Sequence, residues 1–215
     1  MNNSGNIKRN ALIWLIILAP CVFIIINWKD FPNSVPVHFG IDGTPDRFAE
    51  KTRGLFLLPI INIGLYLLIL VLPQIDPRSK NYPLFAGKLR ILMIFVHALL
   101  SFMGFVVAFF SLGKIHDTSL VISYGLVLFM LFFGNYLSGI RSNFFIGFRT
   151  PWTLSNEKNW IQTHRFGGRL WVISSLIMLV LLLAIKEPFE LMLPYICLLA
   201  LGPVIYSYYL FRKTR

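Results

Sequence analysis

The chain has 215 residues, of which 56% are hydrophobic and 13% are charged, and its formal net charge is +11. A soluble domain of this size has too little interior for so much apolar surface, so the composition excludes an ordinary soluble globular protein. The basic residues lie between hydrophobic runs, and we therefore expect a lipid bilayer around the chain and no direct nucleic-acid binding.

Six hydrophobic runs are long enough to cross a hydrocarbon core of roughly 30 Å, which takes about 20 helical residues. Backbone groups in lipid must be hydrogen-bonded within the chain, and the runs lack the period-two pattern of barrel strands, so we predict helices. The predicted fold is an all-α polytopic membrane protein with six transmembrane helices, at about residues 11–28, 54–72, 89–112, 118–138, 170–185 and 191–211.

The basic residues predict the orientation of these helices, because cytoplasmic loops carry an excess of Lys and Arg. We therefore expect both termini and the loop between the fourth and fifth helices to be cytoplasmic. The first run lacks a small-residue cleavage site, so we expect it to be a retained helix and not a signal peptide. The side with the amino terminus holds 14 of the 20 basic residues: Lys8, Arg9, Arg78, Lys80, Lys88, Arg90, Arg141, Arg149, Lys158, Arg165, Arg169, Arg212, Lys213 and Arg215.

The sequence predicts three consecutive parts. Residues 1–72 form a helix pair around an outer loop at 29–53. Residues 73–88 form a polar cytoplasmic connector with three prolines, which we expect to be solvated. Residues 89–215 form a four-helix module with a cytoplasmic loop at 139–169.

The outer loop contains the stretch VPVHFGIDGTPDRFAEK, residues 35–51. Its start alternates like a short strand, and its Asp-Gly and Thr-Pro-Asp segments are turn signals. His38, Asp42 and Asp46 could hold a metal, but their spacing matches no standard site, so we expect turn-forming aspartates and no metal or other cofactor. We assign this element the residues Pro36, His38, Phe39, Asp42, Gly43 and Asp46.

Few polar residues lie inside the predicted helices. Asn62 in the second helix and His97 in the third are the candidates for a transport path, because ionisable groups within a membrane are commonly functional. No Asp, Glu, Lys or Arg lies at mid-span, and an ion or proton path usually needs one. We therefore favour a hydrogen bond between helices for His97, and close helix packing for Gly125 and Gly134.

The loop GFRTPWTLSNEKNWIQTHRFGGRL, residues 147–170, is more specific than a basic loop requires. Proline disfavours helical geometry in the residue before it, so we expect the segment 147–153 to be extended. Arg149 is expected near the inner headgroups, where its guanidinium can fork to carbonyls or a carboxylate and stack on Trp152.

The second half of this loop predicts a helix. Ser155 is a plausible N-cap, and Glu157 then lies in the positively polarised first turn. Trp160, His164, Gly168 and Trp171 recur at helical spacing, on an amphipathic segment that can rest at the headgroups before the chain turns at residues 167–168. We assign a binding or structural role to Gly147, Arg149, Thr150, Pro151, Trp152, Thr153, Trp160, His164, Arg165 and Gly168.

Three stretches of this region resemble the SdpI immunity protein family. They are Gly139-Ile140-Arg141, the string IGFRTPWTL at residues 146–154, and His164-Arg165-Phe166-Gly167-Gly168. Many relatives have Leu where Phe148 stands. The outer loop resembles a small domain of unknown function that precedes this module in many members.

The resemblance implies a six-helix protein of the bacterial cell membrane that protects the producing cell from a secreted, membrane-damaging peptide toxin. The toxin would meet the outer loop. The resemblance also implies signal transduction, in which the membrane protein holds a cytoplasmic winged-helix autorepressor once toxin is present.

Two other classes of function stay open. A small membrane transporter would need a substrate site at His97 and Asn62. An uncharacterised membrane enzyme would need an acid or base near the headgroups, where His38, His116 and His164 lie. No known nucleophile–base, zinc-helix or phosphate-loop motif is present, so we expect no enzymatic activity.

Overall fold

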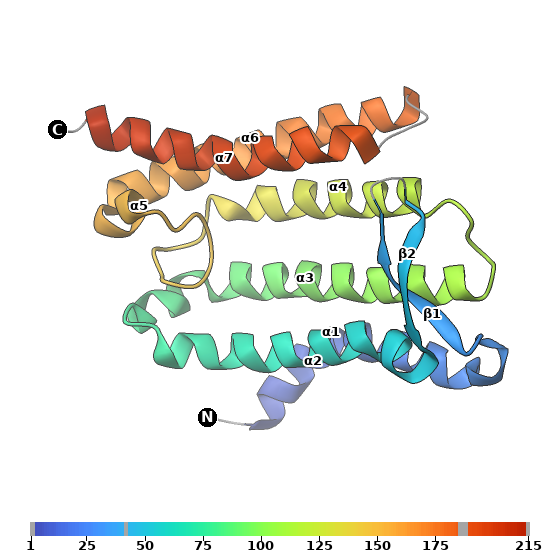
Figure 1. Ribbon diagram of the computed structural model, residues 1–215. Coiled ribbons are helices and arrows are strands. Elements are labelled where there is room, and N and C mark those ends of the chain that lie inside the picture. Colours follow the sequence, from blue (N-terminus) through green and yellow to red (C-terminus); the bar gives the residue numbers. More distant parts are fainter. Residues whose placement is uncertain (1–2, 41–42, 185–188, 214–215) are drawn as a thin grey trace. The chain divides into compact units, whose positions relative to one another are not determined.

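The computed structural model describes residues 3–40, 43–184 and 189–213 (Figure 1). Each predicted hydrophobic run overlaps one long helix, and at least one end of the run lies within three residues of an end of that helix. The elements in chain order are α1 (Asn3–Ile26), η1 (Trp28–Asp30), β1 (Ser34–Phe39), β2 (Pro45–Glu50), α2 (Lys51–Ile75), η2 (Ser79–Asn81), α3 (Tyr82–Ser111), α4 (Thr118–Leu137), α5 (Pro151–Ser155), α6 (Glu157–Ala184) and α7 (Phe189–Lys213).

The long helices have the length and polarity of membrane spans. Among the residues that the structure describes, five segments are long and apolar enough to cross a bilayer; they comprise α2, η2 with α3, α4, α6 and most of α7, and Asn10–Ile26 of α1 forms a shorter apolar helix. Large apolar side chains remain exposed on these helices, including Leu183 at 81% and Val180 at 66%, as lipid contact requires. The predicted mainly α-helical, multi-pass membrane fold is therefore confirmed, while the sixth span and the orientation stay predictions.

The chain packs into two compact units that interleave along the sequence. Unit 1 comprises Met1–Leu67 and Met93–Gly125, and unit 2 comprises Leu68–Leu92 and Leu126–Arg215. The helices α2, α3 and α4 each contribute one segment to each unit. The domain boundaries expected near residues 72 and 88 stay a prediction.

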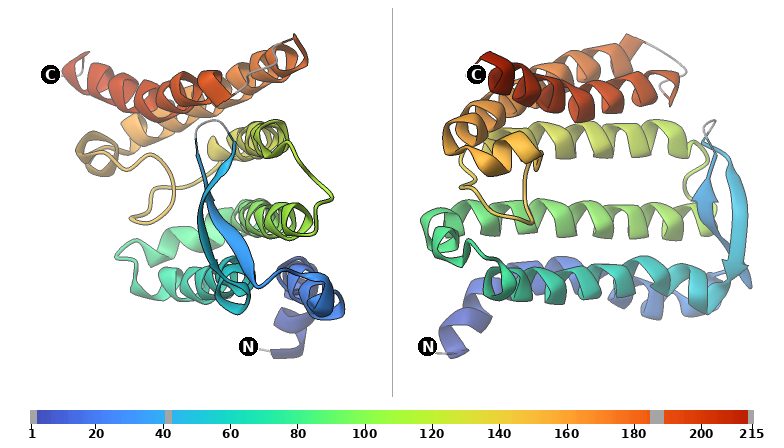
Figure 2. Two further views of the ribbon diagram at one scale, coloured as in Figure 1. Left: turned by 45° about the vertical axis from the view of Figure 1, so that its right-hand side comes forward. Right: turned by 60° about the vertical axis from the view of Figure 1, so that its left-hand side comes forward.

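Unit 1 carries a β-hairpin on its helices. The strands β1 and β2 pair antiparallel, with an irregular register between Pro36 and Phe39. In Figures 1 and 2 the hairpin extends from the start of α2 to the start of α4, where the Thr118 hydroxyl donates to the Gly43 carbonyl at 2.5 Å. Gly43 has a φ of +77°, and a Cβ there would lie 2.6 Å from the Cβ of Ser119. Gly43 is therefore held against the first turn of α4.

Glu50 caps the start of α2, where the hairpin ends. Its carboxylate accepts hydrogen bonds from the Thr52 backbone N–H at 3.1 Å and the Thr52 hydroxyl at 2.9 Å. These bonds, led by the one from the backbone, hold the pKa of Glu50 below its usual range. The carboxylate thus satisfies orphan donors at the start of α2.

Unit 2 is built around the pair α6 and α7, which lie side by side in both Figures 1 and 2. Gly168 of α6 meets α4 so closely that a Cβ there would lie 2.8 Å from the Gly134 carbonyl. The prediction of close packing at Gly134 is confirmed. The core at one end of unit 2 consists of Tyr82, Phe85, Leu92, Leu137, Ile140 and Trp160.

Two local predictions for this region are wrong. The helix α6 runs through Gly167 and Gly168 without turning, because small residues let helices approach while the backbone keeps its hydrogen bonds. Thr150 is extended as expected (φ −101°, ψ 160°), but the predicted extended segment 147–153 is wrong from Pro151 onward, where Pro151–Ser155 forms the short helix α5. Proline fits the first helical position because it has no N–H to leave unpaired.

Candidate functional site

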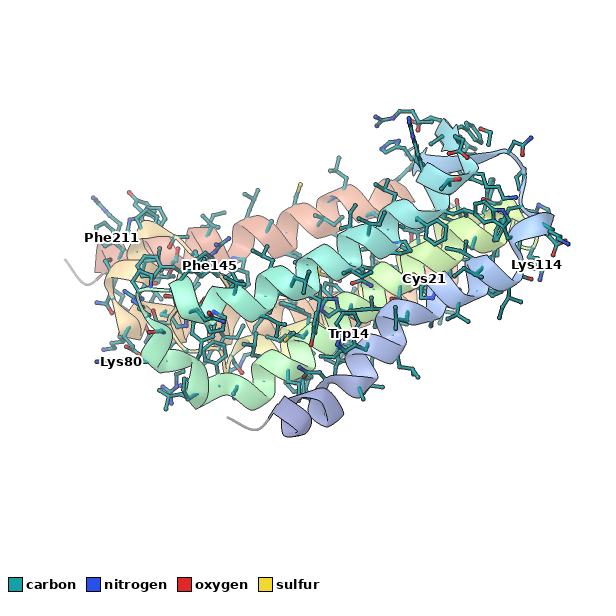
Figure 3. The ribbon with its side chains drawn as sticks, turned by 90° about the horizontal axis from the view of Figure 1, so that it is seen from below. Trp14, Cys21, Lys80, Lys114, Phe145 and Phe211 are labelled. Atoms are coloured by element: carbon teal, nitrogen blue, oxygen red, sulfur yellow. The ribbon has the colours of Figure 1, made fainter. Side chains whose placement is uncertain are left out.

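Two segments of unit 2 close over its core at one end, and we call residues 76–82 and 138–164 the cap. Figure 3 shows Lys80 and Phe145 of the cap at the same end of unit 2 as Phe211 of α7. The cap contains the motif IGFRTPWTL at residues 146–154 and residues 76–82 of the connector. Its polar side chains determine how the irregular backbone is held.

Asp76 joins the connector to the loop. Its side chain is 3% exposed, and Oδ1 accepts from the Arg78 backbone N–H at 2.6 Å. Oδ2 accepts from the Tyr82 hydroxyl and from the Phe144 backbone N–H, each at 2.9 Å. One carboxylate therefore satisfies two backbone donors and a phenol. The expectation of a solvated connector is wrong here, because its acid is a buried hydrogen-bond acceptor.

Arg78 of the connector contacts two separate points of the cap, at Ser142 and Leu154. Its guanidinium donates to the Ser142 hydroxyl and, at 2.5 Å, to the Leu154 carbonyl. It also lies over the ring of Phe144, 5.0 Å from the centroid. A planar guanidinium can make these contacts at once, whereas an ammonium is a point donor.

Asn143 folds the loop on itself. It is fully buried, and its amide nitrogen donates to the carbonyls of Arg141 at 2.9 Å and Ile146 at 3.0 Å. Its Oδ1 accepts from the backbone N–H groups of Phe145 at 2.9 Å and Ile146 at 2.6 Å. The side chain thus replaces the hydrogen bonds that a helix or strand would have given this segment.

His164 and Gly147 fix the middle of the loop. His164 is fully buried, with Nδ1 2.8 Å from the Trp160 carbonyl, so Nδ1 carries the proton. Nε2 then accepts from the Phe148 backbone N–H at 3.0 Å. Gly147 has a φ of +111°, and a Cβ there would overlap His164 Nε2. The glycine is required both by its backbone angle and by the imidazole beside it.

Trp160 lies in the protein interior rather than at the headgroups. It is fully buried, its indole N–H donates to the Ile140 carbonyl at 2.8 Å, and its ring stacks on His164 at a centroid distance of 4.1 Å. The predicted helical stripe is confirmed, since Trp160, His164 and Gly168 are all buried on α6. Trp160 and His164 contact the loop at Ile140 and Phe148, and Gly168 contacts α4. The prediction that this stripe rests at the lipid headgroups is therefore wrong.

Thr150 and Thr153 cap α5 reciprocally. The Thr150 hydroxyl accepts from the Thr153 backbone N–H at 3.2 Å, and the Thr153 hydroxyl accepts from the Thr150 backbone N–H at 2.9 Å. Thr150 also contacts the Ser207 hydroxyl of α7 at 3.1 Å. The N-cap of α6 is Asn156, whose Oδ1 accepts from the Asn159 N–H at 3.0 Å, and the prediction of Ser155 is wrong by one residue.

The two candidate arginines of the loop lie on its surface. Arg149 is exposed and donates from Nη1 to the Phe144 carbonyl at 3.0 Å. Trp152 packs on Tyr208 and Phe211 of α7, at centroid distances of 4.9 and 6.1 Å. The forked arginine of the cap is therefore Arg78 rather than Arg149. Arg165 is exposed on α6.

The outer-loop residues assigned from the sequence form the hairpin of unit 1. Pro36 is buried, and Phe39 packs edge-on against Phe110 at 5.6 Å. His38 Nδ1 lies 2.6 Å from Asp46 Oδ1, with both side chains about half exposed. Asp46 belongs to β2, so its assignment to a turn is wrong, while Asp42 lies outside the described residues. The described residues contain no group of three or more metal-ligating side chains.

Unit 1 also buries a polar cluster among its helices. His97 Nδ1 is 2.6 Å from Asn62 Oδ1, so the predicted hydrogen bond between helices is confirmed. The Asn62 amide donates to the Ser101 hydroxyl at 3.0 Å, and that hydroxyl donates to the Ile16 carbonyl at 2.8 Å. The cluster therefore joins α1, α2 and α3 within unit 1.

The chain is similar to proteins of known families along most of its length. The SdpI/YfhL protein family matches residues 139–207, which include much of the cap, and the domain of unknown function DUF1648 matches residues 15–63. The chain is 26% identical to "Immunity protein SdpI" of Bacillus subtilis over 207 residues, which cover 96% of this chain and 97% of that protein. It is 28% identical over 80 residues to an uncharacterized protein of Archaeoglobus fulgidus, covering 37% and 40% of the two chains.

No solved structure matches the chain significantly. The agreement of both family matches with the near full-length similarity confirms the resemblance drawn from the sequence. Residues 139–207 therefore form a segment of the SdpI/YfhL family, preceded by a DUF1648 domain at residues 15–63, in a chain with the apolar helices of a multi-pass cell-membrane protein.

Proposed function

We propose that this protein is a membrane immunity protein that protects its cell from a secreted peptide toxin. The observation that carries the proposal is the similarity to "Immunity protein SdpI", which extends over nearly the whole of both chains. The alignment covers 96% of this chain and 97% of that protein, so it includes both the segment of this chain that matches DUF1648 and the segment that matches the SdpI/YfhL family.

The geometry of the cap supports a positioning role for the family motif. Asp76, Asn143 and His164 each accept hydrogen bonds from backbone N–H groups of the cap. Side chains used in this way hold a loop in one conformation. We infer that the motif maintains the inner end of unit 2, and that protection is passive rather than chemical.

The test of this proposal is survival of a toxin-sensitive bacterium that expresses the chain. We expect growth at concentrations of a cognate peptide toxin that kill the empty-vector strain, with the peptide recovered intact from the medium. Equal killing of both strains by every peptide toxin tested, at normal membrane levels of the protein, would contradict immunity. Cleavage of the peptide that depends on this chain would place the protein among enzymes instead.

A second role, in signalling, is favoured by the surface of the cap. Arg149 is exposed beside Phe144, which is 38% exposed, so a cation and an aromatic ring are both available to a partner. We propose that a cytoplasmic autorepressor docks here through an acidic face, since a basic face would be repelled. A fluorescent repressor should move to the membrane when toxin is added, and Arg149→Glu should keep it in the cytoplasm without reducing survival.

Both roles require the cap to be cytoplasmic and the hairpin to face outward. A reporter active only in the cytoplasm should function when fused after Arg215, and a reporter active only after export should function when inserted between Asn33 and Ser34. A cytoplasmic signal from the hairpin insertion would overturn the orientation and the toxin-facing role of the hairpin.

A further inference from the structure

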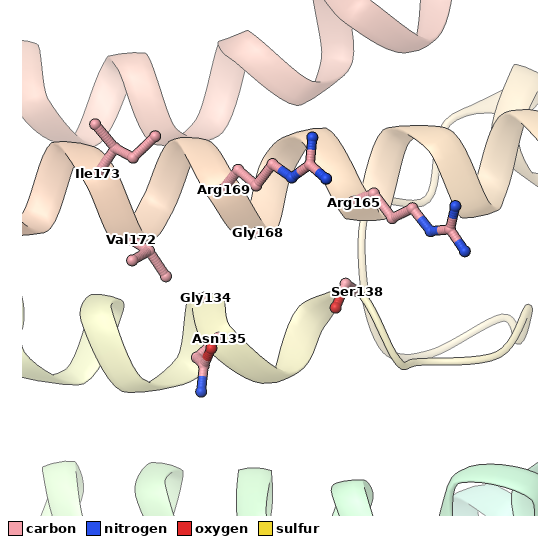
Figure 4. A pocket seen from close by; sticks show the side chains of 8 residues that line it. All are labelled: Gly134, Asn135, Ser138, Arg165, Gly168, Arg169, Val172 and Ile173. Carbon is pink, nitrogen blue, oxygen red and sulfur yellow. The ribbon is translucent and has the colours of Figure 1, made fainter.

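A groove between α4 and α6 of unit 2 contains two arginines that do not take part in the contacts of the cap. Its volume is about 390 Å³. Figure 4 shows residues of α6 on one side of the groove, and residues of α4 with Ser138, which directly follows α4, on the other. The lining residues are Gly134, Asn135, Ser138, Arg165, Gly168, Arg169, Val172 and Ile173.

The sequence places the two arginines on one face of α6. Arg165 and Arg169 are four residues apart, so they lie one helical turn apart, and both are exposed. In Figure 4 both side chains extend along α6 toward its amino-terminal end, which is the direction in which helical side chains point. Like charges at this spacing repel each other, and an anion between them would remove the repulsion.

The residues that line the groove change from polar to apolar along α6. Arg165 and Arg169, with Asn135 of α4 and Ser138 directly after α4, supply cationic, amide and hydroxyl donors, and the eight residues that line the groove include no carboxylate. Val172 and Ile173, one turn further into the apolar part of α6, are both aliphatic, and Ile173 is 57% exposed. The groove therefore has one anion-binding end and one apolar end.

We propose that this groove binds the phosphate of an anionic phospholipid, with an acyl chain along the apolar side chains of α6. Guanidinium groups match phosphate oxygens through paired, charge-assisted hydrogen bonds. A basic pocket between membrane helices, near the level of the headgroups, is the recurring form of such a site. A free phosphate would leave the apolar end unused, so the observations favour a lipid.

Phosphatidylglycerol is the test lipid, and the full-length chain purified in detergent is the test protein. Native mass spectrometry should show that the chain retains phosphatidylglycerol at least about tenfold better than phosphatidylcholine, as expected for one forked contact with phosphate. Inorganic phosphate at millimolar concentration should not displace the lipid. Equal retention of both lipids, or displacement by inorganic phosphate, would overturn the proposal.

The variant Arg165→Gln/Arg169→Gln should lose this preference. The matched control is Lys158→Gln/Arg212→Gln, which removes the same charge from exposed positions outside the groove and should keep the preference. If the glutamine variant cannot be purified, Arg165→Lys/Arg169→Lys keeps the charge but not the fork, and its preference should fall by several-fold. A preference that is unchanged in the lysine variant would contradict forked binding.

The same samples distinguish a protein ligand from a lipid. A peptide of eight glutamates should bind the wild-type chain weakly and should be displaced by phosphatidylglycerol. Peptide binding that depends on Arg165 and Arg169 and resists the lipid would assign the groove to an acidic protein partner and refute the lipid site.

Discussion

The polar cluster of unit 1 and the cap of unit 2 bury the same kinds of side chain for different purposes. In unit 1, Asn62, His97 and Ser101 pair mainly with one another, between helices whose backbone bonds are already made. In the cap, Asp76, Asn143 and His164 pair with irregular backbone. Loss of a cap side chain orphans backbone groups, whereas loss of a helix-to-helix bond lets the remaining group find another partner. The cap should therefore be the more sensitive region.

The largest effect is expected for Asp76→Ala. The change leaves the Phe144 and Arg78 N–H groups and the Tyr82 hydroxyl without their buried acceptor. We expect a loss of about 4 kcal/mol, since each orphaned buried group costs about 1–3 kcal/mol. Equilibrium unfolding in mixed micelles measures this loss. The exposed Asp30→Ala is the control, and equal effects at the two positions would refute the buried-acceptor role.

Gly147→Ala should follow. A φ of +111° strains any residue with a Cβ, and the new methyl group would displace His164 from the Phe148 N–H. We expect about 3 kcal/mol from backbone strain and the lost hydrogen bond together. Gly113→Ala, also at positive φ but with open space around its Cβ position, separates strain from overlap and should cost less in the same unfolding assay.

Arg78→Lys should cost less, about 1.5 kcal/mol, because one donor of the fork is kept and the other is lost. Arg149→Lys is the matched comparison, since Arg149 is exposed and donates to a single carbonyl, and it should leave unfolding unchanged. Because Arg149 is proposed to contact the repressor and not to confer protection, Arg149→Lys should also leave toxin protection unchanged at normal membrane abundance. Loss of protection would contradict a role of Arg149 in signalling alone.

The smallest effect is expected for Asn62→Leu in unit 1. Hydrogen bonds between membrane helices contribute about 0.6 kcal/mol on average, and leucine fills a similar volume in an apolar setting. We expect a cost of about 1 kcal/mol or less in the unfolding assay. A loss as large as that of Asp76→Ala would show that the two regions do not differ in the way described.

The sequence was sufficient for features that depend on local composition. The long helices follow from apolar runs of the right length, and the buried face of α6 follows from the spacing of Trp160, His164 and Gly168. The geometry of Thr150 follows from the proline after it. The residues that carry these signals lie close together in the sequence.

The cap could not be derived in this way because its partners lie far apart in sequence. Arg78 meets Ser142 and Leu154, and Asp76 meets Phe144, across 64 to 76 residues. One signal was available, since Asp76 is a rare acid among the basic residues assigned to the cytoplasmic side. An acid that opposes the charge bias of its side indicates a local interaction, and for Asp76 this interaction is with the backbone of the loop at Phe144.

The most direct test of this account is amide hydrogen exchange across residues 142–153 of the chain in lipid nanodiscs. The N–H groups of Phe144, Phe148 and Thr150 donate to side chains of the cap, so we expect slow exchange of these amides, like that of the helices. Asp76→Asn should accelerate the exchange of the Phe144 amide more than that of the Thr150 amide. Exchange at the rate of a free loop in the wild-type chain would contradict an ordered cap.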